Sequence, residues 1–313
     1  MQAVWGIDLG GTKIEGVVLP ADAISQAAQP GHSEPIKPLA RLRIDTEADR
    51  GYTHILHQIQ KLVQMLEQQT GLRPQRIGIG TPGALDPATG LMKNSNTVCL
   101  NGQPLKKDLE ALLQIPLTMA NDANCFALAE SRLGRVAREG LEAEVVFGVI
   151  MGTGVGGGLV VHRQLIHGAQ GIAGEWGHNF LDASGGPCYC GKTGCVETVI
   201  SGPALERYYA GLTGERIKLK TIVERYHQHE TAAQQTIERL LENFSKAISV
   251  VINIVDPDVI VLGGGLANID LLYTEGVQRI RKYVFNNRLD TRVYPPSLGD
   301  SAGVFGAAML VAN

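Results

Sequence analysis

Apolar runs alternate with amphipathic stretches along the first part of the chain. Residues 3–9 and 14–19 are apolar runs joined by a Gly-Gly-Thr-Lys turn, which predicts a strand hairpin. In residues 52–69 apolar side chains recur at three- and four-residue spacing until Gly71, so we expect a helix there. The apolar run at 76–81 predicts the next strand. This order of strand, helix and strand is typical of α/β proteins.

The second half of the chain repeats the residue pattern with which the first half begins. Residues 4–12 and 146–154 both run from a valine through an aromatic residue, a glycine and a β-branched residue to a glycine turn, so the halves have the pattern of duplicates. The other elements that we expect are a helix at 106–114, a strand at 117–120, a helix starting at Asn121-Asp122, helices from about residue 200, a long helix at 231–255, a strand at 259–262 and a terminal helix after Ser301.

The length and composition of the chain indicate a protein of two domains. The 313 residues are enough for about two domains, and a 44% hydrophobic content gives each a core. We expect a first α/β domain at 1–120 together with the C-terminal helix 301–313, and a larger second domain at 121–300. Residues 21–38 lack periodicity, and we expect them to form a surface excursion to which we assign no function.

Charge and hydropathy exclude several kinds of partner. The 28 basic and 31 acidic residues give a net charge of −3 with no basic cluster, so we expect no nucleic acid and no anionic membrane as partner. The nearly uncharged stretch 145–161 contains six glycines, which argues against a membrane span. The start of the chain lacks a secretory signal, so we expect a cytoplasmic protein. The residues leave the oligomeric state open, a homodimer included.

The first candidate site is the turn Asp8-Leu-Gly-Gly-Thr-Lys13. The N–H groups of Gly10 and Gly11 can bind phosphate oxygens, Thr12 can add a hydroxyl donor, and Asp8 can hold Mg²⁺ directly or through water. An ordinary hairpin turn is the alternative, and the spacing alone does not decide between them.

Two further glycine motifs match nucleotide-binding patterns in the wrong context. Residues 152–158 satisfy GxGxxG, and Glu175 follows at the distance of a ribose-binding acid, but Gly158 leads into β-branched residues instead of a helix. A second hairpin phosphate turn fits better than a nicotinamide site. Residues 186–193 satisfy GxxxxGK[ST] without the strand before and the helix after that a P-loop needs.

The cysteines of that last segment are better explained as metal ligands. Three thiolates and one imidazole within 18 positions suit a closed tetrahedral zinc site, which would be structural because it has no open coordination position. The alternative is a set of reduced surface thiols. The predicted ligands are His178, Cys188, Cys190 and Cys195, in a loop at 178–195.

The remaining polar residues offer acid–base and hydroxyl-binding chemistry. Asp122 lies where a strand becomes a helix, so it is either the N-cap of that helix or a general base that accepts a proton from an attacking hydroxyl. Glu175 and Glu197 flank the predicted zinc loop and can accept hydrogen bonds from hydroxyls. Trp176 is either buried or stacked on a sugar face.

Taken in order, DLGGTK, the second glycine turn, NDAN, GEWGH, CxCGxxGCxE and VIVLGGGL resemble the ROK family of sugar kinases nearly from end to end. The resemblance implies two ribonuclease-H-like domains of the actin/hexokinase type, with an interdomain cleft that closes on ATP and a sugar. It also implies that Asp122 is the catalytic base. An extra N-terminal helix-turn-helix domain, as in the family's repressors, is not expected.

The resemblance assigns the other site residues position by position. His178 would give one ring nitrogen to zinc and the other to a sugar hydroxyl. The phosphates would be held by Gly10, Gly11, Thr12, Lys13, Thr153 and Gly154, and the adenosine would lie near Gly263, Gly264 and Gly265. The sugar would be lined by Gly83, Asn96, Asn121, Glu175, His178 and Glu197.

The sequences at 93–102 and 175–179 look most like those of bacterial fructokinases and manno(fructo)kinases. We therefore expect D-fructose to be phosphorylated at the 6-hydroxyl by ATP and Mg²⁺, with mannose as secondary substrate. Glucose or an N-acetylhexosamine within the same family is the alternative, and so is a sugar sensor without catalysis.

Overall fold

The computed structural model describes residues 2–27, 29, 32 and 34–312. The chain divides into two compact units, and it passes from one to the other at 143/144, 157/158, 173/174 and 296/297. The first unit comprises the chain up to Ala143, Gly158–Ala173 and the C-terminal segment from Ser297. The second comprises Glu144–Gly157 and Gly174–Pro296. This division differs from the expected boundary at 120/121, because the helix that starts at Asp122 packs within the first unit.

The first unit is built on a mixed five-stranded sheet in the order β3-β2-β1-β4-β7. β1 pairs antiparallel with β2, and parallel with β4, which in turn pairs parallel with β7. The carboxyl ends of β1, β4 and β7 therefore meet at one edge of the sheet. The strands are β1 Ala3–Leu9, β2 Lys13–Pro20, β3 Ala40–Asp45, β4 Ile77–Thr81 and β7 Leu117–Asn121.

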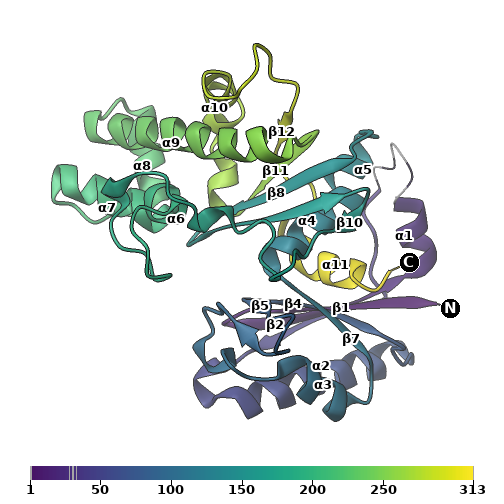
Figure 1. Ribbon diagram of the computed structural model, residues 1–313. Helices are drawn as coiled ribbons and strands as arrows, with labels where there is room; N and C mark the ends of the chain where they lie inside the picture. The colour runs from purple at the N-terminus through teal and green to yellow at the C-terminus, as the bar shows by residue number, and fades with distance from the viewer. Residues whose placement is uncertain (1, 28, 30–31, 33, 313) are drawn as a thin grey trace. The chain divides into compact units, whose positions relative to one another are not determined.

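Helices cover both faces of this sheet (Figure 1). On one face lie α2 (Tyr52–Thr70) and α3 (Leu105–Leu113), and the apolar side chains spaced along α2 are fully buried in the core, as the periodicity predicts. On the other face α4 (Asp122–Arg132) packs against α11 (Ala302–Met309). Glycine allows this contact to be very close, since a Cβ added at Gly306 would lie 1.8 Å from the carbonyl oxygen of Cys125.

Several short elements of the first unit have no strong sequence pattern. The segment expected to be an irregular excursion begins with a helix, α1 (Ala21–Ala27), which buries Ile24 and Ala27. That expectation was wrong for these residues because one turn or two of helix shows too little periodicity; residues 28, 30–31 and 33 lie outside the described part. The others are a hairpin of β5 (Ala84–Leu85) with β6 (Met92–Lys93), and α5 (Arg135–Arg138).

The second sheet has the order β10-β9-β8-β11-β12, and its first hairpin also contains a glycine turn. β8 (Val145–Met151) and β12 (Arg292–Tyr294) both pair parallel with β11 (Val259–Gly263). β9 (Val155–Val161) passes from the second unit into the first at 157/158 and pairs with the short β10 (Gln164–Leu165). Because Gly158 lies within a strand, the rejection of a dinucleotide-binding helix after the GxGxxG match is confirmed.

The helices of the second unit gather around α9, the longest of them. α9 (Thr231–Val255) contacts α6, α7, α8 and α10, and it ends at Asp256 with a positive φ of 48°. No helix in the described part of the chain is both long and apolar enough to cross a bilayer. The surrounding helices are α6 Val196–Ile200, α7 Gly202–Thr213, α8 Leu219–His227 and α10 Glu275–Ile280.

The close packing of α11 on α4 gives a testable prediction. Gly306→Ala should lower the free energy of unfolding by about 2 kcal/mol or more, because its methyl group meets backbone atoms that cannot rotate away. Gly211→Ala is the matched control: it lies in the exposed part of α7 with no atom within 4 Å of the added Cβ, and should stabilise by about 0.5–1 kcal/mol. Equal urea midpoints for the two variants would contradict the packing described here.

Candidate functional site

The first glycine turn is held in shape by Thr46. The Gly10 N–H donates to the Lys13 carbonyl (2.9 Å), while the Thr46 N–H and hydroxyl donate to the carbonyls of Thr12 (2.9 Å) and Gly10 (2.7 Å). Gly11, Thr12 and Lys13 are exposed. The turn therefore has its carbonyls fixed by the protein and its outer face accessible, as a phosphate-binding turn requires.

Asp8, near the end of β1, has a carboxyl group packed between two glycines. A Cβ at Gly303 would lie 2.7 Å from one carboxyl oxygen, and a Cβ at Gly80 would lie 3.3 Å from the other. Burial, together with the negative charges of Asp122 and Glu15, raises the pKa of Asp8 to about 7. A divalent cation would offset the repulsion between these carboxylates, so the residues present fit the predicted Mg²⁺.

Asp122 is not the helix cap. The N-cap of α4 is Asn121, whose side-chain oxygen accepts the Asn124 N–H at 2.8 Å. The Asp122 side chain is exposed in the first turn of α4, where its Oδ1 accepts the N–H of Ala123 at 2.8 Å. Loss of hydration among the surrounding protein atoms raises the pKa of Asp122. The backbone N–H groups of Ala123 and of Asp122 itself oppose this rise. Asn121 thus does the capping, which leaves Asp122 available for proton transfer.

Gly83 and Asn96 lie in the segments that follow β4 and β6. Thr81 donates its hydroxyl to the Gly83 carbonyl (2.8 Å), and a Cβ at Gly83 would lie 2.7 Å from the Cα of Ser95. Asn96 is exposed, and its neighbour Thr97 has its buried hydroxyl 3.3 Å from the Cβ position of Gly11. The structure therefore brings the Asn96 segment beside the first glycine turn.

The second glycine turn, between β8 and β9, is fixed from two sides. The Gly202 N–H at the start of α7 donates to the Gly152 carbonyl at 2.9 Å, and Oε2 of Glu197 accepts the Val155 N–H at 2.9 Å. The glycines after β11 lie against it: a Cβ at Gly264 would meet the Met151 carbonyl oxygen at 2.3 Å. Gly264 also has a φ of 77°, so glycine is required there by backbone conformation as well.

The four predicted zinc ligands come together in the second unit. Their ligand atoms all lie within 4.8 Å of one another, with the Cys190 and Cys195 sulfurs 3.6 Å apart and His178 Nδ1 3.6 Å from the Cys188 sulfur. Ligand atoms around tetrahedral zinc are about 3.5–4 Å apart, so the cluster fits the ion. The cysteines are free thiols. The P-loop-like residues 186–193 form turns within this loop and lead to no helix directly, which confirms that match as accidental.

His178 places its second ring nitrogen away from the cysteines. Nε2 lies 3.0 Å from the hydroxyl of Tyr189, whose exposed ring stands perpendicular to the imidazole. Sequence reasoning missed Tyr189, although its position between two predicted ligands was a signal. Trp176 is buried, with its N–H on the Gly156 carbonyl (2.9 Å), so the alternative of a core tryptophan is the correct one.

Each unit carries its own part of the predicted site. The first unit holds Asp8, Gly10, Gly11, Thr12, Lys13, Gly83, Asn96, Asn121 and Asp122. The second unit holds Thr153, Gly154, Glu175, His178, Cys188, Cys190, Cys195, Glu197, Gly263, Gly264 and Gly265.

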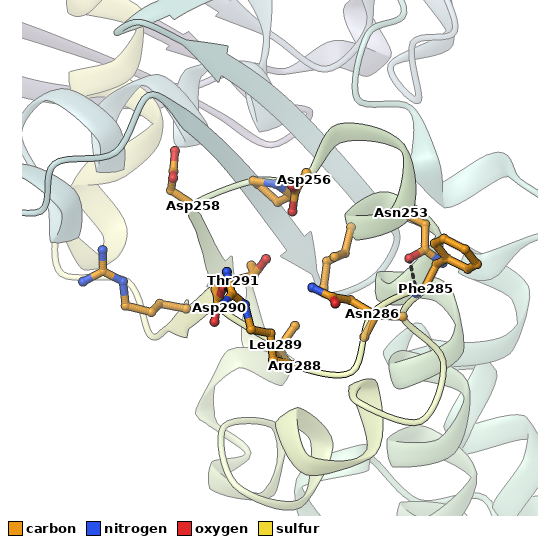
Figure 2. A pocket seen from close by; sticks show the side chains of 13 residues that line it. Asn253, Asp256, Asp258, Phe285, Asn286, Arg288, Leu289, Asp290 and Thr291 are labelled. Atoms are coloured by element: carbon orange, nitrogen blue, oxygen red, sulfur yellow. Dashed lines mark hydrogen bonds and ion pairs between the residues drawn. The ribbon is translucent and has the colours of Figure 1, made fainter.

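A separate pocket of about 570 Å³ lies in the second unit at the C-terminal end of α9 (Figure 2). Asn253, Asp256, Asp258 and the segments 284–286 and 288–292 are among its lining. It adjoins the amino end of β11, whereas Gly263–Gly265 follow the carboxyl end, and none of the predicted site residues of the described chain belongs to its lining. Asp258 is used structurally, since it accepts the N–H groups of Glu144 and Val145 at 2.9 Å.

Comparison with known proteins places this geometry in a family. The model of the ROK family matches residues 4–313. The N-acetyl-D-glucosamine kinase of Vibrio atlanticus (strain LGP32) is 35% identical over 316 residues, which is 98% of each chain. The ROK hexokinase structure from Thermus thermophilus has a TM-score of 0.84 and 28% identity, over 99% of this chain and 97% of that one.

A ROK family glucokinase from Streptomyces griseus, solved in complex with glucose and AMPPNP, has a TM-score of 0.76 and 26% identity over 99% of both chains. These similarities confirm the expected α/β fold class of the actin/hexokinase type.

The His/Cys cluster predicts bound metal. The purified protein should contain about one zinc per chain by mass spectrometry of the metal, and Cys190→Ala should lose it because three ligands hold zinc much more weakly than four. Cys99→Ala is the control, since Cys99 lies outside the cluster with its sulfur 3.7 Å from the Ala48 carbonyl. Equal zinc contents of the two variants would show that the cluster does not bind the ion.

The environment of Asp8 predicts a pH effect on stability in metal-free buffer. Its pKa is raised from 3.8 to about 7 on folding, so the folded state holds this proton more tightly and the free energy of unfolding falls as pH rises through this window. Asp8→Asn cannot titrate, and should gain stability relative to the wild type between about pH 4 and pH 7, with no further gain above. The exposed Asp49→Asn serves as control. Parallel pH profiles of wild type and Asp8→Asn in urea unfolding would contradict the burial of this carboxyl.

Proposed function

Since the chain belongs to the ROK family, we propose that it is an ATP-dependent sugar kinase that phosphorylates a hexose at the 6-hydroxyl. The observation that carries this proposal is the exposed carboxylate of Asp122, which is relieved of capping by Asn121. Asp122 lies close enough to Asp8 to raise its pKa, at the edge of the sheet where β1 leads into the first glycine turn. A base beside a phosphate-binding turn is the arrangement that phosphoryl transfer needs.

In the proposed reaction the 6-hydroxyl of the sugar gives its proton to the Asp122 carboxylate as its oxygen attacks the γ-phosphorus of ATP. The bond from that phosphorus to the bridging oxygen breaks, and ADP leaves. The N–H groups of Gly10 and Gly152 donate to the Lys13 and Gly154 carbonyls inside their own turns, so they are not the phosphate donors that the sequence suggested for Gly10. Other backbone N–H groups of the two glycine turns and the Thr12 hydroxyl bind phosphate oxygens, and Gly263–Gly265 adjoin the adenosine. Mg²⁺, when bound at Asp8, neutralises phosphate charge.

Side chains that hydrogen-bond to hydroxyl groups would recognise the sugar. Glu175, His178 and Glu197 of the second unit, and Gly83, Asn96 and Asn121 of the first, are the proposed set. Structural zinc on Nδ1 would fix the imidazole of His178 and direct Nε2 to a hydroxyl. Because Tyr189 occupies the hydrogen-bonding position on Nε2, a sugar hydroxyl must displace it there.

The choice of hexose needs a correction. The relatives named above support N-acetyl-D-glucosamine or glucose better than the expected D-fructose, which rested on short stretches at 93–102 and 175–179. We therefore propose N-acetyl-D-glucosamine as the first substrate. Fructose is the second candidate, because those stretches contain Asn96, Glu175 and His178, three of the proposed sugar-binding residues.

A panel of sugars tests both choices. ADP release should be measured with Mg-ATP and N-acetyl-D-glucosamine, glucose, mannose, N-acetylmannosamine and fructose. One sugar should lead in kcat/KM by about tenfold or more, since a missing or inverted hydroxyl leaves a buried partner unpaired. Fructose in the lead would overturn the substrate choice but not the kinase. Sugar binding without ADP release from any member would favour the sugar sensor.

Asp122→Asn tests the mechanism. The amide cannot accept the proton, so kcat should fall by about 10² or more while sugar affinity stays within about threefold of the wild type. Asp49→Asn, an exposed carboxylate of the same unit, should keep the wild-type kcat. Sugar affinity is measured by isothermal titration calorimetry and kcat with the leading sugar of the panel. A wild-type turnover rate in the Asn variant would rule out Asp122 as the base.

A further inference from the structure

Glu197 makes a contact that a sugar-binding role does not require. It lies in the first turn of α6, two positions after Cys195, and its Oε2 accepts the backbone N–H of Val155 at 2.9 Å. Val155 is the first residue of β9 and directly follows the second glycine turn. One carboxylate oxygen is therefore committed to the turn, and among the described residues none hydrogen-bonds to the other oxygen.

The Glu197 carboxylate lies close to Gly154, the last residue of the second glycine turn. Gly154 does not have a positive φ, so its backbone conformation is open to other residues. A Cβ there would lie 2.6 Å from Oε2 of Glu197 and 3.5 Å from its carboxyl carbon. An alanine at 154 would therefore have to move the Glu197 carboxylate or the turn, although it would not strain the backbone.

The two ends of the turn are held in different ways. At Gly152 the attachment is backbone to backbone, since the Gly152 carbonyl accepts the N–H of Gly202. At Val155 the attachment is the Glu197 side chain. A side chain can be redirected by a ligand, whereas the backbone contact at Gly152 cannot change without moving α7.

We infer that Glu197 is a positioning residue for the second glycine turn, with Oε2 holding the turn in its phosphate-binding shape while Oε1 binds a sugar hydroxyl. This rests on the proposed function. A sugar that orients the carboxylate also orients the turn, so hexose and nucleotide bind more tightly together than apart. The coupling passes through one side chain within the second unit.

A double-mutant cycle on nucleotide affinity tests the inference. The dissociation constant of Mg-AMPPNP is measured by isothermal titration calorimetry without sugar, for wild type, Gly154→Ala, Glu197→Ala and the double variant. Gly154→Ala should weaken binding by about tenfold or more, because the methyl group displaces the carboxylate or the turn. In the Glu197→Ala background the methyl group has room, so the added penalty should be less than about twofold.

Glu197→Gln provides the conservative comparison. Its amide oxygen can still accept the Val155 N–H, so Mg-AMPPNP affinity should stay within about threefold of the wild type, while Glu197→Ala loses about tenfold. The leading sugar of the panel should bind more weakly to both variants. A residue that only reads sugar would leave the nucleotide affinity of Glu197→Ala unchanged.

The outcomes separate this inference from the proposed function. Nucleotide binding by the wild type with equal Gly154→Ala penalties in both backgrounds overturns the positioning role alone. A wild-type protein that does not bind Mg-AMPPNP overturns both. Circular dichroism melting of all variants accompanies the cycle, and a Gly154→Ala penalty that appears only as lost stability, with unchanged nucleotide affinity below the melting transition, also overturns the positioning role.

Discussion

The structure depends on close approaches that only glycine allows. In the first unit the backbone of α11 packs directly on α4 and β4, with Cβ positions at Gly306 and Gly78 each 1.8 Å from a carbonyl oxygen. The same device places carboxylates: Gly303 makes room for Asp8, and Gly154 makes room for Glu197. The high glycine content thus reflects contacts between neighbouring segments as well as turns, and at Gly306 and Gly78 the atoms in contact are backbone atoms that a larger residue could not displace.

At the strand ends, neutral polar side chains make the structural hydrogen bonds, and an acidic side chain stays exposed. Asn121 caps α4, so the adjacent Asp122 keeps an exposed carboxylate, while Thr46 donates to the Gly10 and Thr12 carbonyls of the first glycine turn. Buried polar groups need partners, and here neutral donors and acceptors supply them. Asp8 and Asp122, the carboxylates proposed for phosphoryl transfer, are consequently not needed to cap α4 or to hold the first glycine turn.

The predicted zinc loop, residues 178–195, has little hydrophobic core of its own. Residues 178–195 contain short turns and isolated bridges, with Phe180 and Tyr189 exposed. Four ligands that converge within 4.8 Å can substitute for hydrophobic packing, because a metal ion cross-links segments that bury little apolar surface. Glu197, two positions after the predicted ligand Cys195, links this loop to the second glycine turn.

The sequence alone predicted the long elements, the two glycine-turn hairpins and the His/Cys cluster. These are local or strongly periodic: α2 and α9 bury one face at helical spacing, and ligand residues close in sequence can meet with little help from the fold. Short elements such as α1 and β12 show too few residues for a period, and a domain boundary at 120 could not anticipate that α4 packs against a helix from the other end of the chain. Likewise only the tertiary structure decided that Asn121 rather than Asp122 caps α4, and that Gly80, Gly303 and Gly154 are spaces for carboxylates. Such roles depend on which atoms come into contact in the folded chain. Neither residue spacing nor composition determines the distance between atoms that are far apart in the sequence.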